Sequence, residues 1–187
     1  MVTVIYKKWS AMMKRCYSED YHVNHPTYKD CSVCEEWLTF SNFKSWMETQ
    51  DWEGKDLDKD LLIYSNKMYS PNTCCFISPV INKFLTKRQN ERGLYPLGVS
   101  YRNKLADMVN EFTSPFRARV SITTKHQTHL GYFKTPEEAH RAWQKAKAAL
   151  AFDLALEQTD ERVKQGLMRV YEKILSDYEQ GLETKDF

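Results

Sequence analysis

The sequence predicts an α+β protein with two strands among helices in its first half and a three-stranded antiparallel sheet packed on one helix in its second half. Three observations predict this. Large apolar residues recur at intervals of three and four near both ends of the chain. Two short apolar segments flank a turn-rich stretch in the first half, and three strand-like segments precede a long amphipathic segment in the second. The predicted domains are residues 1–91, residues 92–155 and a C-terminal amphipathic helix within 156–187.

The first half begins with two predicted helices, over residues 3–18 and 35–48, each with a stripe of aromatic, methionine or cysteine side chains. The stretch 19–30 between them is polar and contains Pro26, which predicts a loop. We expect the aromatic stripes to form core rather than a binding surface, because five large apolar residues within eleven must be buried.

Two strands and a short helix complete the first half. The segments 57–65 and 74–78 are rich in apolar residues, and the stretch 66–73 between them is rich in turn formers. A helix is expected over 80–89, with Ser78 as its N-cap and Pro79 in its first turn.

The second half contains predicted strands over 98–102, 116–122 and 128–133, followed by a helix over 135–150. In the middle strand apolar residues alternate with Arg117, Arg119 and Ser121, so one face can pack on the helix while the other carries arginines into solvent. Apolar residues spaced by three and four then predict a helix over 160–181, capped by Thr159 or Asp160. Its apolar face is expected to cover the body of the protein or to form a homodimer.

The charge of the chain is concentrated on the sheet. The formal net charge is only +2, but residues 92–155 hold ten Lys and Arg against five Asp and Glu, while residues 1–91 balance at twelve of each. Residues 156–187 hold five basic and eight acidic residues. A basic open sheet is typical of proteins that contact nucleic acid, although the same excess also suits an ordinary solvated surface.

The sequence contains no apolar run of the roughly 18 residues that a membrane span needs. Its first residues do not form a signal peptide, so we expect a cytoplasmic protein with no membrane partner. Five cysteines without a secretory signal argue against a disulfide framework, which leaves burial or metal binding for them.

The second half resembles the APETALA2/ethylene-response-factor DNA-binding domain, and most closely the form of that domain found in bacteriophage endonucleases. The resemblance covers about residues 95–155 and rests on four phrases in order, GVSYR, FRARV, HLGYF and TPEEAHRAW. It implies that the sheet enters the major groove of double-stranded DNA. Carried over by position, the DNA-contacting residues are Ser100, Arg102, Arg117, Arg119, Ser121, Gln127 and His129.

Two departures from that domain are visible. His129 stands where the plant domains carry a tryptophan that contacts the groove. The insertion NKLADMVNEFTSP between the first two strands is longer than in the plant domains. The arginines themselves suit the task, because a guanidinium matches guanine edges and phosphates.

The strand-loop-strand-helix order of the first half resembles the ββα-metal nucleases, called HNH, of bacteriophages. The resemblance implies a site-specific, homing-type DNA endonuclease in a bacterial host, with one Mg²⁺ or Mn²⁺ polarising a phosphate. Asp58 falls on the metal-ligand position, Asn72 on the loop asparagine that steadies the site, and Asn82 on a helix residue that helps to hold the metal.

One residue departs from the HNH pattern. The histidine that activates water is Lys59 here, and a lysine is protonated at neutral pH unless burial lowers its pKa strongly. Asp60 is an alternative ligand or base, because side chains two residues apart in a strand share a face. The alternative is a ββα scaffold without activity in which Lys59 contacts phosphate.

A single CxxC, Cys31 to Cys34, leaves a structural zinc open. Such a site needs about four ligands, which Cys16, His22, His25 or one of the neighbours Cys74 and Cys75 would complete. The alternative is that these cysteines are small buried apolar residues.

Three functions therefore compete. The first is the metal-dependent endonuclease. The second is a nuclease-inactive derivative that binds DNA and represses transcription or blocks a site. The third is a phage protein that binds and inhibits a host protein through its N-terminal aromatic residues.

Overall fold

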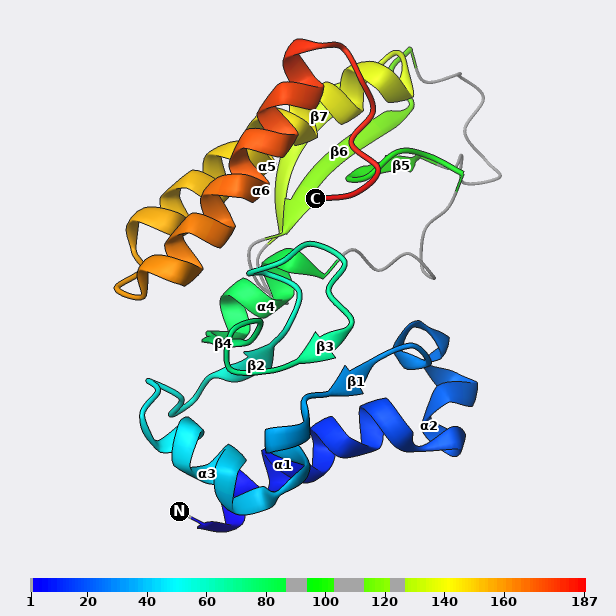
Figure 1. Cartoon of the computed structure of the whole chain (residues 1–187). Helices are drawn as coiled ribbons and strands as arrows, with labels where there is room; N and C mark the ends of the chain where they lie inside the picture. Colours follow the sequence, from blue (N-terminus) through cyan, green and yellow to red (C-terminus); the bar gives the residue numbers. More distant parts are fainter. Residues whose placement is uncertain (1, 87–93, 103–112, 122–126) are drawn as a thin grey trace. The chain divides into compact units, whose positions relative to one another are not determined.

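The computed structural model describes residues 2–86, 94–102, 113–121 and 127–187 of the chain (Figure 1). It divides into two compact units, Met1–Pro79 and Val80–Phe187. The fold is mixed α+β, with a three-stranded antiparallel sheet and a C-terminal helix in the second unit, as the sequence predicts. The predicted division between residues 91 and 92 lies outside the described residues.

The first unit consists of short helices and two small two-stranded sheets (Figure 1). Parallel strands β1 and β3 form one sheet, and antiparallel strands β2 and β4 form the other, with Asp58 opposite Cys75. Its elements are α1 (Val2–Tyr17), α2 (Glu19–Asn24), η1 (Pro26–Tyr28), β1 (Ser32–Val33), η2 (Glu35–Leu38), α3 (Phe40–Glu48), β2 (Asp56–Asp58), β3 (Met68–Tyr69) and β4 (Cys75–Ile77).

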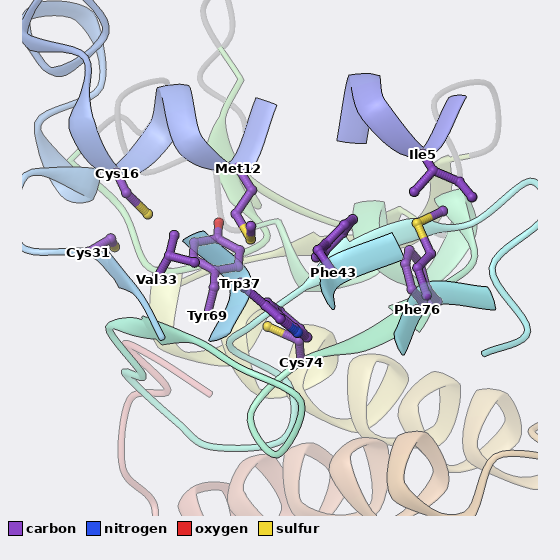
Figure 2. Close-up of a cluster of buried hydrophobic side chains, with 11 residues drawn as sticks. Ile5, Met12, Cys16, Cys31, Val33, Trp37, Phe43, Tyr69, Cys74 and Phe76 are labelled. Carbon is purple, nitrogen blue, oxygen red and sulfur yellow. The ribbon is translucent and has the colours of Figure 1, made fainter. Parts of the chain in front are cut away.

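Aromatic side chains from both predicted stripes pack in the core of the first unit (Figure 2). Trp37 is fully buried, and its ring centroid lies 5.1 Å from that of Phe43 and 4.4 Å from that of Trp46. The indole N–H of Trp9 on α1 donates to the carbonyl of Trp37 at 2.7 Å, which ties α1 to η2. The prediction that these aromatic residues form core is confirmed.

Two predicted elements in this unit are wrong in part. The expected loop over 19–30 contains α2 and η1, because the Ser18 side chain accepts from Tyr21 N–H and starts a helix with two acidic residues in its first turn. The expected helix over 35–48 is instead η2 followed by α3, and the extended backbone of Thr39 (φ −94°, ψ 119°) separates them.

The second unit contains α4 (Pro79–Leu85), which begins at the last residue of the first unit, and a sheet in the order β5–β6–β7. The sheet strands are β5 (Val99–Tyr101), β6 (Phe116–Ser121) and β7 (Gln127–Phe133). Helix α5 (Pro136–Leu156) packs on one face of this sheet, and α6 (Glu161–Glu179) packs on α5 (Figure 1). Trp143 of α5 is buried with Leu97 and Val120.

Local signals explain the two long helices. Thr135 and Glu138 form a capping box at the start of α5, with Pro136 in its first turn. Asp160, one of the two predicted caps, is the N-cap of α6 and accepts from Arg162 N–H. Gly98 precedes β5 at φ +77°, where a Cβ would lie 1.9 Å from an atom of the Trp143 ring, so only glycine fits there.

The segment after α6 is held against α5 by buried polar contacts. The two ring nitrogens of His140 contact the Leu97 carbonyl at 2.9 Å and the Thr184 N–H at 3.0 Å. The Thr184 hydroxyl in turn donates to Asp177 and accepts from Gln144. His140 therefore links the turn before β5 to the segment after α6, which is a structural role for a buried histidine.

Candidate functional site

The outer face of the β5–β6–β7 sheet carries most of the residues that were predicted to contact DNA. Along β6, Ala118 and Val120 are buried under α5, while Arg117, Arg119 and Ser121 alternate with them. Cross-strand pairing aligns Arg117 with Ser100 on β5 and with Tyr132 on β7. The predicted alternation of an apolar inner face and a basic outer face is therefore present in the structure.

Two contacts order the arginines at one end of this face. The Arg117 Nε donates to the Ser100 hydroxyl at 3.4 Å. The guanidinium of Arg102, directly after β5, lies 5.0 Å from the ring centroid of Tyr132. Such stacking on an aromatic ring restricts the orientation of a guanidinium.

A β-bulge changes which residues of β7 face outward. Ala118 pairs with Gly131 and Arg119 pairs with His129, so Leu130 is an extra residue between the pairs. Leu130 packs against the inner core, and Gly131 adopts φ +131°, which favours glycine. His129 and Tyr132, three residues apart, consequently share the outer face, with ring centroids 4.7 Å apart.

Tyr132 is thus a member of the face that sequence reasoning missed. Strict alternation from His129 places Gly131 outward and Tyr132 inward, whereas the Tyr132 side chain is 43% exposed. A lone glycine inside a strand is a signal for a bulge, and Gly131 was such a signal. Gln127 pairs with Ser121 in the ladder, and its side chain lies outside the described residues.

The charge of this face has a single sign. The described strands β5, β6 and β7 contain no Asp or Glu, and none of the described carboxylates forms an ion pair with Arg117 or Arg119. Partial burial and then the charge of Arg117 lower the pKa of Arg119. Like charges held side by side repel one another, so an anion that binds between them is stabilised.

The Asp58 carboxylate has a different setting in the first unit. Its Oδ1 accepts from the backbone N–H groups of Asp60 at 2.9 Å and Leu61 at 2.7 Å. The chain therefore turns at Asp58, which ends β2, and the predicted strand over 57–65 is wrong beyond this residue. Burial raises the pKa of the Asp58 carboxyl, although the hydrogen bonds from Leu61 and Asp60 oppose that change.

Lys59 lies inside the turn and is only 7% exposed. Its Nζ donates to the Asp60 carboxylate at 2.6 Å and to the Asn66 carbonyl at 2.8 Å. It also lies 6.0 Å and 5.9 Å from the ring centroids of Tyr28 and Tyr69. Burial alone would lower the pKa of Lys59, but the hydrogen bond and charge of Asp60 outweigh it and raise the pKa, so the ammonium keeps its proton.

Asn66 is the second residue that sequence reasoning missed. Its Nδ2 donates to the carbonyls of Lys59 at 2.9 Å and Met68 at 2.6 Å, and its Oδ1 accepts from Met68 N–H at 3.2 Å. One side chain therefore closes the loop between β2 and β3. The only signal in the sequence was its place at the start of a turn-rich stretch.

These contacts do not fit a divalent cation at Asp58. One of its oxygens is already used by two N–H groups, and Asp60 is held by the Lys59 ammonium rather than turned with Asp58 toward a shared ligand. Asn72 is exposed in the turn before β4, and Asn82 belongs to α4 in the other unit. Within the first unit, Asp58 and Asp60 therefore do not form a shared ligand site, and the catalytic roles of the predicted residues stay predictions.

The cysteines lie mainly in the core of the first unit. Cys16 of α1 and Cys31 point toward the same part of that core (Figure 2), and burial followed by the Cys31 thiol raises the pKa of Cys16 to about 12. Burial also raises the pKa of Cys74 to about 12. Within the described ranges, no group of three or more His, Cys, Asp or Glu is placed to hold a metal ion. Cys31 and Cys34 are free thiols packed with apolar residues.

None of the helices in the described segments combines the length and apolar character that crossing a bilayer requires. No family model, curated protein or solved structure matches the chain. Function must therefore be inferred from the residues of the chain itself.

Proposed function

We propose that this protein binds double-stranded DNA through the outer face of the β5–β6–β7 sheet. The observation that carries the proposal is the alignment of Arg117 and Arg119 on one open face without any acidic residue in the described strands. A twisted sheet of this width fits the major groove, where guanidinium groups donate to guanine edges and to phosphates. The bacteriophage-type resemblance of residues 95–155 supports the same partner.

The face has parts for both positioning and base readout. Ser100 and Ser121 carry hydroxyl groups that can donate to phosphate oxygens. Arg102 is oriented by Tyr132, and Arg117 by Ser100, so two guanidinium groups are held in defined positions before DNA arrives. Side chains that are already ordered lose less conformational entropy on binding.

The first unit does not support a cleavage step with equal strength. A general base must be able to accept a proton, and the Lys59 ammonium is held in its protonated form by Asp60. We therefore favour a DNA-binding protein, such as a repressor or site blocker, over the metal-dependent endonuclease that the HNH resemblance implies. A role as an inhibitor of a host protein has no specific observation in its favour.

The decisive experiment measures DNA affinity of the Arg117→Ala, Arg119→Ala double variant, using a labelled duplex with a randomised centre. We expect a loss of about 2 kcal/mol or more in binding free energy and a shallower dependence on salt, because each arginine contact contributes about 1–3 kcal/mol. Selection from the randomised pool shows whether the sheet reads bases, since contacts to phosphate alone enrich no sequence.

A matched control removes the same charge from the same unit. Arg162 and Lys164 lie near the start of α6, and each has a carboxylate partner, Asp160 or Glu161. The Arg162→Ala, Lys164→Ala variant should bind DNA nearly as well as the wild type. Equal losses in the two double variants, or no loss in either, would refute the sheet as the binding face.

A further inference from the structure

Helix α1 carries an exposed basic face that the proposed DNA-binding sheet does not include. Its sequence, VTVIYKKWSAMMKRCY, contains four basic residues and no acidic residue. The net charge of residues 1–91 is zero, so this local excess is hidden in the composition of the first half.

The four cations divide into two pairs. Lys8 and Arg15 are half-buried: the Lys8 ammonium donates to the Lys55 carbonyl, and the Arg15 guanidinium lies 5.9 Å from the Tyr28 ring centroid. Lys7 and Lys14 are exposed, and no described carboxylate forms an ion pair with either of them. The Lys14 ammonium lies 5.8 Å from the ring centroid of Tyr21, and its side chain is nevertheless exposed. Lys7 and Lys14 are therefore the two cations of α1 that solvent reaches.

Helical geometry places the second pair on one line. Residues seven apart are nearly two full turns apart, about 10 Å along the axis, so Lys7 and Lys14 point in nearly the same direction. Thr3, Ser10 and Ala11 lie on the same side and are also exposed. The opposite side holds the buried residues Ile5, Met12 and Cys16. We call the set Thr3, Lys7, Ser10, Ala11 and Lys14 the α1 basic face.

The stability of the helix does not account for this face. Cations in a last turn complement the helix dipole, which explains Lys14 and Arg15 but not Lys7 in the middle. Exposed lysines usually gain from a glutamate one turn away, and α1 has none. Ser10 and Ala11, which lie between the two lysines on this face, have short side chains. A charged partner can therefore approach the helix backbone closely.

We propose that the α1 basic face binds the phosphate backbone of duplex DNA as a second contact, in addition to the sheet. This inference rests on the proposed function. Duplex DNA carries one negative charge for about every 1.7 Å of its helix axis, so each of two cations about 10 Å apart can reach a phosphate of its own. The Ser10 and Thr3 hydroxyl groups are further donors for phosphate oxygens. The contact adds affinity without reading sequence.

The test compares salt dependence of DNA affinity for the full chain and its Lys7→Gln, Lys14→Gln variant. The slope of log affinity against log salt should become shallower by about 2, because two phosphate contacts are lost. The sequence enriched from a randomised duplex pool should not change, and the midpoint of urea unfolding should stay the same because both side chains are exposed. The charge-matched control is Lys44→Gln, Lys164→Gln, which removes two lysines that already have glutamate partners.

The outcomes separate this inference from the proposed function. An unchanged slope, or an equal change in the control, overturns the α1 contact even when the Arg117→Ala, Arg119→Ala variant shows that the sheet binds DNA. A shallower slope with no effect of the sheet variant supports α1 and refutes the sheet. Loss of binding to phosphatidylserine vesicles with an unchanged DNA slope overturns the inference in favour of a membrane surface. A chain that binds no duplex at all overturns both.

Discussion

Two short charged segments, Asp58-Lys59-Asp60 at the end of β2 in the first unit and Arg117-Ala118-Arg119 within β6 in the second, differ in how their charges are paired. In the first, every charge has a partner: Asp58 accepts two backbone N–H groups, and the Lys59 ammonium bonds to Asp60 and to the Asn66 carbonyl. In the second, two like charges stand on one face with a buried alanine between them. The first segment is satisfied by its own chain, and the second is complementary to an anion.

This difference shows why charge type alone is a poor guide to function. Both segments have the residue types of a phosphate or metal site. What separates them is the local partner, because the buried Lys59 ammonium has already exchanged water for protein contacts and is not available to a ligand. Arg117 and Arg119 have no carboxylate partner among the described residues, so their charges are available to an anion.

Among the substitutions that test this contrast, Lys59→Ala should cause the largest change, a loss of stability. The change leaves the half-buried Asn66 carbonyl without its donor and opens space beside Tyr69, so we expect a loss of about 2 kcal/mol in the free energy of unfolding. DNA affinity should not change. Urea unfolding and duplex binding measure the two quantities.

Lys59→Met is the control, because it keeps most of the apolar stem that packs in the turn. It should cost less stability than Lys59→Ala. If both variants keep the wild-type unfolding midpoint, Lys59 does not hold the turn and the contrast between the two segments disappears.

An intermediate effect is expected from Tyr132→Ala, which removes the ring that orients Arg102. DNA affinity should fall by about 1 kcal/mol, the typical contribution of a cation–π contact together with a lost contact surface. Thr128→Ala is the matched control, because Thr128 pairs with the buried Val120 and so belongs to the opposite side of β7. Equal effects of the two changes would show that the bulge does not define the binding face.

The smallest effect should come from Asp58→Asn, measured as stability against pH. Burial raises the pKa of Asp58, with the Asp60 carboxylate raising it further and the Lys59 ammonium opposing it. The folded state therefore binds this proton more tightly than the unfolded state, and the contribution of Asp58 to stability falls as pH rises through the raised pKa. Asparagine still accepts the two N–H bonds, so the variant should exceed the wild type by up to about 1 kcal/mol at neutral pH and match it at acid pH.

The wild type and the Asp58→Asn variant, compared with and without Mg²⁺, also test the endonuclease hypothesis. We expect Mg²⁺ to leave the melting temperature of both proteins unchanged and plasmid DNA uncut. A rise in melting temperature for the wild type but not for Asp58→Asn, with DNA cleavage, would restore a metal role for Asp58.

Much of the fold could be predicted because its signals are periodic and local. The stripe from Trp9 to Tyr17 indicated α1, and the capping pair Thr135 and Glu138 lies where α5 begins. The strand expected over 57–65 was wrong because one side chain, Asp58, bonds to the backbone just after it, and such a bond overrides apolar composition. Tyr132 was missed because one extra residue in β7 reverses the alternation.

By itself, the sequence determined the α+β class, the order of the strands and long helices of the second half, the apolar faces that become core, and the basic character of the second half. These follow from spacing and composition, which act over a few residues. Only the tertiary structure decided which charges are neutralised and which face outward. That decision depends on partners that the folded backbone brings together, such as Asn66 for Lys59 across a loop and Tyr132 for Arg102 across the sheet, and no periodic pattern encodes those contacts.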